Sequence, residues 1–305
     1  MEAYHFARPD ITLAAYKKEH KNPRCCVFIA HGMAEHTLRY ADFAEFLHSN
    51  GMSVFGHDHR GHGTTEGQHG YFADKNGWNL CVEDMAAHIS HIKQNNSQIP
   101  LFVFGHSMGS FLMQEYLIRY SHEVDGAILS GSNGKPAPIA KIGYMIALLE
   151  SKLRGGKAIA TISEKIASSE FNKRFQPTRT DRDWLSRDKE HVDMYIADPQ
   201  CGFPCTTQFW LDMLQGIDEI CKPERQKKVR SDLPLFIFGG TMCPVGLYGR
   251  GLRNLINAYT QAGLFRLTYC LYPNGRHEML NEINRQEVYE DNLRWLNEQL
   301  KAISS

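Results

Sequence analysis

The sequence has no long apolar run, no leader-like start and no excess of charge. Without about 18 consecutive apolar residues it predicts no transmembrane helix. Residues 1–6 do not combine a positive segment with an apolar one, so we expect an unexported, cytoplasmic protein. Because 34 basic residues balance 34 acidic residues, no whole-molecule field attracts polyanions, and we expect no nucleic-acid partner.

Cysteine is not arranged for a disulfide scaffold or a zinc finger. The eight cysteines are scattered through 305 residues, a pattern typical of reduced thiols in a cytosol-like compartment. Cys201 and Cys205 lie close together, but no second ligand pair stands at zinc-finger spacing. Nothing in the sequence requires a metal or an organic cofactor, and we expect neither.

The sequence does contain short apolar runs that alternate with longer segments of helical period. The runs are rich in β-branched and aromatic residues, as in strands buried on both faces of a parallel sheet. They are 25–30, 52–55, 101–104, 127–130, 235–238 and 267–272. The alternation predicts an α/β fold with a mostly parallel, doubly wound sheet.

The alternation stops between 134 and 231, where we find no convincing buried strand. Apolar residues in 139–153 and 159–166 recur at helical spacing instead. We therefore expect a helical cap at 134–231, inserted into an α/β core formed by 1–133 and 232–305. Residues 135–182 carry ten basic and four acidic side chains. This excess indicates either a solvated surface or a face that makes peripheral contact with anionic membranes.

A serine between two glycines is the most informative local feature. Gly105-His106-Ser107-Met108-Gly109 stands between an apolar run and an apolar helical segment. In a nucleophile elbow of this kind, the glycines allow a tight turn that exposes the serine Oγ and points the next N–H toward the same place. We predict that Ser107 is a catalytic nucleophile, although glycine-flanked serines also occur in ordinary turns.

An acyl-transfer serine also needs oxyanion donors and a base. His31-Gly32-Met33 follows the first apolar run, so the Met33 N–H could join the Met108 N–H as an oxyanion hole. The alternative is a plain turn at the end of a strand. His277 follows the last apolar run, where the chain order serine, acid, histidine places the base.

Together these motifs resemble the monoacylglycerol lipase and lysophospholipase group of serine α/β-hydrolases. The resemblance runs in order through 31–40, 58–63, 105–109 and 272–282, with cap segments at 183–188 and 198–203. It implies an α/β-hydrolase fold and hydrolysis of a monoacyl lipid or small ester through an acyl-Ser107 intermediate. It also implies that His277 acts first as base and then as acid. Monoacylglycerol and lysophospholipid both stay open as substrates.

One position departs from the family's pattern. After the strand at 235–238 the family usually has Gly-x-x-Asp-Pro-Val, and that aspartate orients the histidine; here Cys243 precedes Pro244-Val245. A neutral thiol is a poor acceptor for the imidazole N–H. In serine proteases, loss of the aspartate's function costs roughly 10⁴-fold in turnover. The residues after the preceding strand, 132–133, offer no carboxylate instead.

Three explanations of Cys243 stay open. The protein is a slow Ser–His hydrolase or recruits another carboxylate, for which the candidates are Glu278, Glu282 and Asp218. It is a catalytically weak or inactive lipid-binding protein on the same scaffold. Otherwise, Cys243 is an introduced substitution in an active enzyme. A thiolate paired with a histidine imidazolium would hold the base protonated, so we interpret Cys243 as a defect in the triad.

Two further features have competing interpretations. His57-x-His59-x-x-His62 has the histidine spacing of a metal hydrolase, but Gly61 stands where that motif needs an aspartate. The helical stripe of Ile139, Ile142, Ile146 and Leu149 would suit an acyl chain, although such stripes serve plain packing more often.

Overall fold

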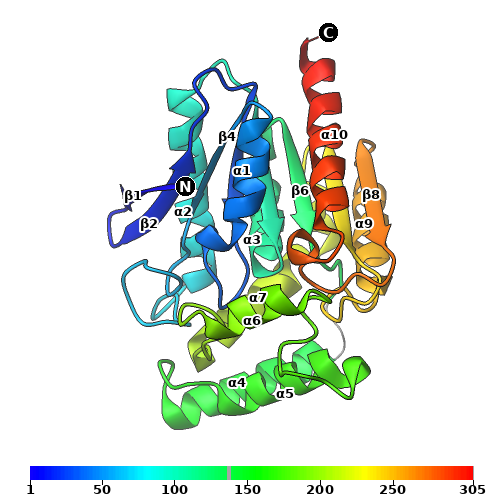
Figure 1. Ribbon diagram of the computed structural model, residues 1–305. Helices are drawn as coiled ribbons and strands as arrows, with labels where there is room; N and C mark the ends of the chain where they lie inside the picture. Colours follow the sequence, from blue (N-terminus) through cyan, green and yellow to red (C-terminus); the bar gives the residue numbers. More distant parts are fainter. Residues whose placement is uncertain (136–138, 305) are drawn as a thin grey trace.

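An eight-stranded sheet forms the centre of the molecule. The computed structural model describes residues 1–135 and 139–304 (Figure 1). The strands are β1 (Glu2–Ala7), β2 (Thr12–Lys18), β3 (Cys25–Ala30), β4 (Met52–His57), β5 (Leu101–His106), β6 (Gly126–Ser130), β7 (Leu235–Gly240) and β8 (Leu267–Tyr272). Their order across the sheet is β1-β2-β4-β3-β5-β6-β7-β8, and pairing is parallel from β4 to β8. The predicted fold class is confirmed.

Helices cover both faces of the sheet. α1 (Ala41–Ser49) and α10 (Arg285–Ser304) pack on one face, and α2 (Gly77–Asn95), α3 (Met108–Tyr120) and α9 (Arg250–Ala262) on the other. Side chains of β3 alternate between the two cores: Cys26 and Phe28 face the α2–α3 side, whereas Val27 and Ile29 face the α1–α10 side. A strand buried on both faces must be apolar at every position, which is why its sequence reads as a continuous run.

The sheet departs from the sequence prediction at one edge. β1 and β2 pair antiparallel, and β2 pairs antiparallel with β4; the sequence prediction missed both strands. Their residues are partly exposed and many are polar, so they lack the apolar run that marks a central strand. β8 forms the other edge with the predicted bounds, but it is not covered on both faces, because two of its six residues are exposed and three are half-buried.

In the described part of the segment between β6 and β7 there are five α-helices, across the range expected for the insertion. They are α4 (Ile139–Arg154), α5 (Thr161–Asn172), α6 (Lys189–Ala197), α7 (Thr207–Ile220) and α8 (Pro223–Gln226). α7 packs on α2 and α3, and α4 packs on α7. α4 and α5 therefore lie farthest from the sheet, beyond α6 and α7 (Figure 1).

The interpretation of the α4 stripe as an acyl-chain surface is wrong. Ile142 and Leu149 are 60% and 59% exposed and Ile146 is half-buried, and no described residue of α4 lines the active-site pocket described below. The side chain of Ile139 lies outside the described residues. The stripe faces solvent because α7 covers only the opposite side of the helix, where Ala147 is buried. Over residues 1–135 and 139–304, no helix combines the length and apolarity needed to cross a bilayer.

Candidate active site

Ser107 occupies a sharp turn between β5 and α3. Its backbone has φ 51° and ψ −121°, a conformation that costs energy for a residue with a side chain. The turn fits because α3 approaches β3 closely at Gly109, where an added Cβ would lie 2.2 Å from the Ala30 carbonyl oxygen. This strand–turn–helix geometry is the context that distinguishes a nucleophile elbow from an ordinary turn.

His277 stands beside Ser107, although 170 residues separate them. Its Nε2 lies 2.9 Å from the Ser107 Oγ. The loop after β8 that carries His277 is fixed by the cap, because the Glu278 N–H donates to the Leu185 carbonyl oxygen at 2.8 Å. The ring of Trp184 lies against the imidazole with 5.0 Å between centroids. The cap therefore helps to position the histidine.

Cys243 lies on the other side of the imidazole. Its Sγ is 3.1 Å from His277 Nδ1, and it accepts the Gly246 N–H at 3.2 Å. Burial raises the pKa of the Cys243 thiol to about 12, despite the opposing effect of the Gly246 and Val245 N–H groups. At neutral pH the group in the acid position is therefore an uncharged thiol.

The imidazole is also neutral. Burial, with smaller contributions from His106 and Arg39, holds the pKa of His277 well below its usual value, and Glu278 opposes this only in part. A neutral His277 has two tautomers, and only the one with its proton on Nδ1 leaves Nε2 free to accept from Ser107. A thiol can donate to Nδ1 or accept from it, so it does not enforce this tautomer as a carboxylate does.

The three carboxylates that were candidates to replace the triad acid either pair with other residues or lie elsewhere. Glu278 binds Arg39 through both oxygens at 2.7 Å, and Glu282 binds Arg187 at 2.9 Å. Asp218 is exposed on α7. Within residues 1–135 and 139–304, none of them hydrogen-bonds His277.

The loop after β3, residues 31–35 and called the oxyanion-side loop below, also approaches Ser107 closely. A Cβ on Gly32 would lie 3.2 Å from the Ser107 Cβ and 2.6 Å from a Glu35 oxygen, so only glycine allows this approach. Met33 lies next in the loop and lines the pocket. Met108 is the first residue of α3, and N–H groups of a first helical turn have no intrahelical partner. The two methionines predicted as oxyanion residues thus flank Ser107.

A buried ion-pair network joins this loop to the histidine loop. The Arg39 guanidinium donates to Glu35 at 2.5 Å and to Glu278 at 2.7 Å. Burial alone would raise the pKa of Glu278, but Arg39 outweighs it and holds that pKa at about 2. Glu35 also accepts the Gly32 N–H and the Tyr40 hydroxyl. The family motifs contain all these residues, but the sequence does not show that Arg39 bridges segments 239 residues apart.

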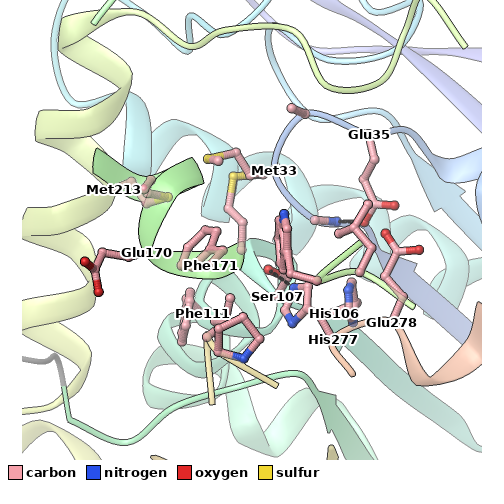
Figure 2. A pocket seen from close by; sticks show the side chains of 18 of the residues that line it. Met33, Glu35, His106, Ser107, Phe111, Glu170, Phe171, Met213, His277 and Glu278 are labelled. Atoms are coloured by element: carbon pink, nitrogen blue, oxygen red, sulfur yellow. Dashed lines mark hydrogen bonds between the residues drawn. The ribbon is translucent and has the colours of Figure 1, made fainter. Parts of the chain in front are cut away.

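A pocket of about 350 Å³ opens at Ser107. Met33, Phe171 and Met213 extend along it, whereas Ser107 and His277 stand at one side (Figure 2). Its walls come from the oxyanion-side loop, from α5 and α7 of the cap, and from 244–248 after β7. The lining is mainly apolar, and its charged residues are Glu35, Glu164, Glu170, Arg182 and Glu278. Sequence reasoning missed the cap residues because the fold brings them to the serine from distant segments.

Among the described residues, the histidines of the alternative metal motif are not grouped as metal ligands. His57, His59 and His62 are buried, and burial lowers the pKa of each. Their rings contact one another and aromatic neighbours. Among the described residues, they form no group of three ligands whose donor atoms approach within 4.8 Å.

The sheet order, the strained serine after β5 and the histidine after β8 define an α/β-hydrolase. Residues 21–284 match the protein family described as "Serine aminopeptidase, S33", and the chain belongs to this family. This match and the relatives below confirm the resemblance predicted from the motifs.

Two named relatives and one solved structure are similar to this chain over most of its length. The monoacylglycerol lipase of Mycolicibacterium smegmatis is 29% identical over 90% of this chain and 89% of its own length. The monoglyceride lipase of Rattus norvegicus is 25% identical over 74% of this chain and 67% of its own length. A thermostable carboxyl esterase from Bacillus coagulans, solved in complex with glycerol, is 27% identical, with a TM-score of 0.90 and 98% of each chain covered.

Proposed function

We propose that this protein hydrolyses carboxylic esters of monoacyl lipids, monoacylglycerol or lysophospholipid, through an acyl-Ser107 intermediate. One observation carries the proposal: the Ser107 Oγ lies 2.9 Å from His277 Nε2 at the edge of an apolar pocket. A hydroxyl within hydrogen-bonding distance of a neutral imidazole has a base for its proton. The family membership and the names of the relatives support the same reaction class.

The reaction has two halves. The Ser107 oxygen bonds to the ester carbonyl carbon while its proton moves to His277 Nε2, and the resulting oxyanion accepts the N–H groups of Met33 and Met108. The carbon–oxygen bond to the alcohol then breaks, and the imidazolium returns its proton to the leaving alcohol. Water repeats the sequence on the acyl-enzyme, which releases the fatty acid and restores the serine.

The pocket supports a substrate with one acyl chain. Its apolar walls would bury the chain, and burial of apolar surface contributes about 25 cal/mol per Å². The relatives named monoacylglycerol lipase and monoglyceride lipase favour a glycerol headgroup. Glu170 and Arg182 give the pocket polar positions of both signs, so a zwitterionic lysophospholipid headgroup is the second substrate to test.

We further propose that Cys243 leaves the enzyme slow. A carboxylate at Nδ1 would select the productive tautomer and stabilise the imidazolium that forms during attack. The neutral thiol does neither, and no carboxylate of the described residues replaces it. In a serine protease the corresponding loss costs roughly 10⁴-fold in turnover, and we expect a loss of comparable order here.

The same thiol favours one alternative function. If the imidazole rests in the tautomer with its proton on Nε2, Ser107 has no base and the apolar pocket binds a monoacyl lipid without cleaving it. The distinguishing chemistry is covalent, because a fluorophosphonate labels Ser107 only when the serine is activated.

The test combines labelling with turnover. We expect the fluorophosphonate to label the protein slowly at Ser107, and we expect slow hydrolysis of p-nitrophenyl butyrate, a monoacylglycerol or a lysophospholipid. Both signals should be absent from Ser107→Ala. Binding of the lipids with neither labelling nor hydrolysis would establish the alternative, and hydrolysis that persists in Ser107→Ala would reject Ser107 as the nucleophile.

The exposed face of α4 supports a proposal about where the protein encounters its substrate. Met145, Leu149 and Leu153 form an apolar stripe, and Lys152 and Arg154 lie in the last turn of the same helix. An apolar face beside basic residues binds the interface of an anionic bilayer. We propose that α4 makes peripheral contact with lipid surfaces that contain the substrate.

A further inference from the structure

A cluster of three metal-ligating side chains lies where the cap meets the oxyanion-side loop. His36 follows that loop, whereas Asp198 and Cys201 lie in the turn after α6. His36 Nε2 is 2.9 Å from the Asp198 Oδ2. One donor atom from each side chain, including the Cys201 Sγ, lies within 4.8 Å of the other two. The cluster does not include Ser107, His277 or Cys243.

The donors have the chemistry of a zinc site. Zinc takes imidazole nitrogen, thiolate sulfur and carboxylate oxygen, usually four in a tetrahedron. Donor atoms of such a tetrahedron stand about 3.5 Å apart, so movements of about 1 Å would bring these three to a common ion. Asp198 has a side chain that is 33% exposed, which leaves a side from which an ion and a water ligand can enter.

The His36 imidazole presents one nitrogen to the other ligands. The residue is only 7% exposed, and its Nε2 faces the Asp198 carboxylate. Its Nδ1 has no hydrogen-bond partner among the described residues. The nitrogen that would bind an ion is therefore Nε2, which would exchange its hydrogen bond to Asp198 for the metal, while Nδ1 would carry the ring proton.

The surrounding charge does not oppose a cation. Arg39 is the cation that acts on the Cys201 thiol, but Glu35 and Glu278 both pair with it. A second guanidinium, that of Arg182, donates to the Gly202 carbonyl oxygen at 3.3 Å. With the carboxylate of Asp198, three carboxylates stand against two guanidinium groups, so a divalent ion would enter a region with a slightly negative balance.

We propose that His36, Asp198 and Cys201 bind a zinc ion that fastens the cap to the oxyanion-side loop. On binding, the Cys201 thiol releases its proton and the thiolate bonds to zinc, with no change of oxidation state. The two segments already meet at Ala34, whose carbonyl oxygen accepts the Gly202 N–H at 2.9 Å and the Tyr195 hydroxyl at 3.0 Å. A metal bond beside these hydrogen bonds would stiffen the entrance to the pocket.

Sequence spacing alone does not reveal this site, since His36 is 162 residues from Asp198 and 165 from Cys201 along the chain. The sequence predicts no zinc finger on Cys201 and Cys205, and Cys205 is not part of the cluster found among the described residues. Cys205 is nevertheless a buried thiol four residues away. This makes Cys205→Ala a matched control for Cys201→Ala.

The test measures binding of Zn²⁺ and Co²⁺ alone to the purified chain, with no substrate. We expect one zinc per chain with a micromolar or tighter Kd. We also expect a thiolate-to-cobalt charge-transfer band with Co²⁺. Zinc at about 100 times the Kd should raise the Tm by about 5 °C. Cys205→Ala should behave like the unaltered protein.

Loss of a ligand should weaken binding strongly. Cys201→Ala should lose the cobalt charge-transfer band and bind zinc at least about 100-fold more weakly. Asp198→Asn keeps the side-chain shape and should weaken binding at least about tenfold, which keeps the test decisive if Cys201→Ala does not fold. Failure of the unaltered protein to bind zinc at micromolar concentration overturns the proposal, as does equal binding by folded Cys201→Ala or Asp198→Asn.

Discussion

The Sγ of Cys243 lies 3.1 Å from Nδ1 of His277 and accepts the Gly246 N–H at 3.2 Å. This is the environment of an anion: a backbone donor on one side and an imidazole on the other. The side chain in that place is nevertheless uncharged, because burial raises the pKa of the thiol to about 12. The site therefore has the arrangement of a catalytic triad with a neutral third member.

The neutral thiol predicts an unusual pH profile. His277 must be uncharged to accept the Ser107 proton, and burial holds its pKa well below the usual value of about 6.5. The activity of the unaltered protein should therefore persist as the pH falls through 6, with no acid limb near neutrality. In Cys243→Asp the carboxylate favours the imidazolium and raises the pKa of His277, so the acid limb of kcat/KM should move up by about one pH unit or more.

The matched control for this profile is Cys243→Ser, which places another neutral group at Nδ1. Its acid limb should coincide with that of the unaltered protein. An acid limb near pH 7 in the unaltered protein would mean that an anion already faces His277.

The Arg39 network predicts a large loss of stability on substitution. Arg39→Met leaves Glu35 and Glu278 buried without their cation, and breaking a buried ion pair in this way costs about 3–5 kcal/mol. Urea denaturation measures this loss. Arg294→Met removes an exposed arginine that pairs with Asp291 and should cost at most about 1 kcal/mol. Equal effects of the two substitutions would show that the network does not hold the two loops together.

The buried histidines predict that stability decreases with acid. Burial lowers the pKa of His62 to about 4 and holds those of His31, His57 and His59 well below their ordinary values. Between pH 6.5 and about 4 the unfolded chain therefore binds protons that the folded chain does not. The free energy of unfolding should fall with pH there, by up to about 1.4 kcal/mol per pH unit for each group.

A single substitution tests the contribution of one ring. His62→Gln cannot take up a proton, so its free energy of unfolding should fall less steeply between pH 6.5 and 4. His122→Gln, at an exposed position, should leave the slope unchanged. The explanation fails if the slope of His62→Gln equals that of the unaltered protein.

Local patterns were sufficient to predict the fold and to propose two residues that the structure brings together. β3 has the predicted bounds and the other central strands differ from them by up to two residues, because strands covered on both faces must be apolar throughout. The edge strand β8 also has the predicted bounds. Ser107 and His277 could be found because an elbow and a histidine after the last strand are features of short segments. The positions of Arg39, Trp184 and Phe171 depend on tertiary contacts between distant segments. Such contacts cannot be derived from the periodicity of apolar residues in the sequence.

The orientation of α4 illustrates the same limit. Its sequence shows an apolar stripe but not whether protein, substrate or solvent faces it, and the structure leaves it exposed.

We predict that Met145→Glu combined with Leu149→Glu weakens binding to vesicles of phosphatidylcholine and phosphatidylserine at least about tenfold, since a buried side chain of this size contributes about 1.5–3 kcal/mol. Sedimentation with vesicles measures the loss.

The control for this prediction is Ile283→Glu, which changes an exposed apolar side chain outside the cap. It should bind vesicles like the unaltered protein, and all variants should hydrolyse a short soluble ester at the same rate. The proposed lipid contact is wrong if the unaltered protein does not bind vesicles, or if the α4 substitutions do not weaken that binding.

The most direct test of the central claim is the kcat/KM of Cys243→Asp for p-nitrophenyl butyrate and for a monoacylglycerol, beside the unaltered protein and Cys243→Ser. Gly246 and Val245 already direct N–H groups at this position, so they would stabilise a carboxylate there. We predict an increase of at least about 100-fold in Cys243→Asp and none in Cys243→Ser. A folded Cys243→Asp protein with unchanged or lower activity would contradict the account of an intact hydrolase site that lacks its acid.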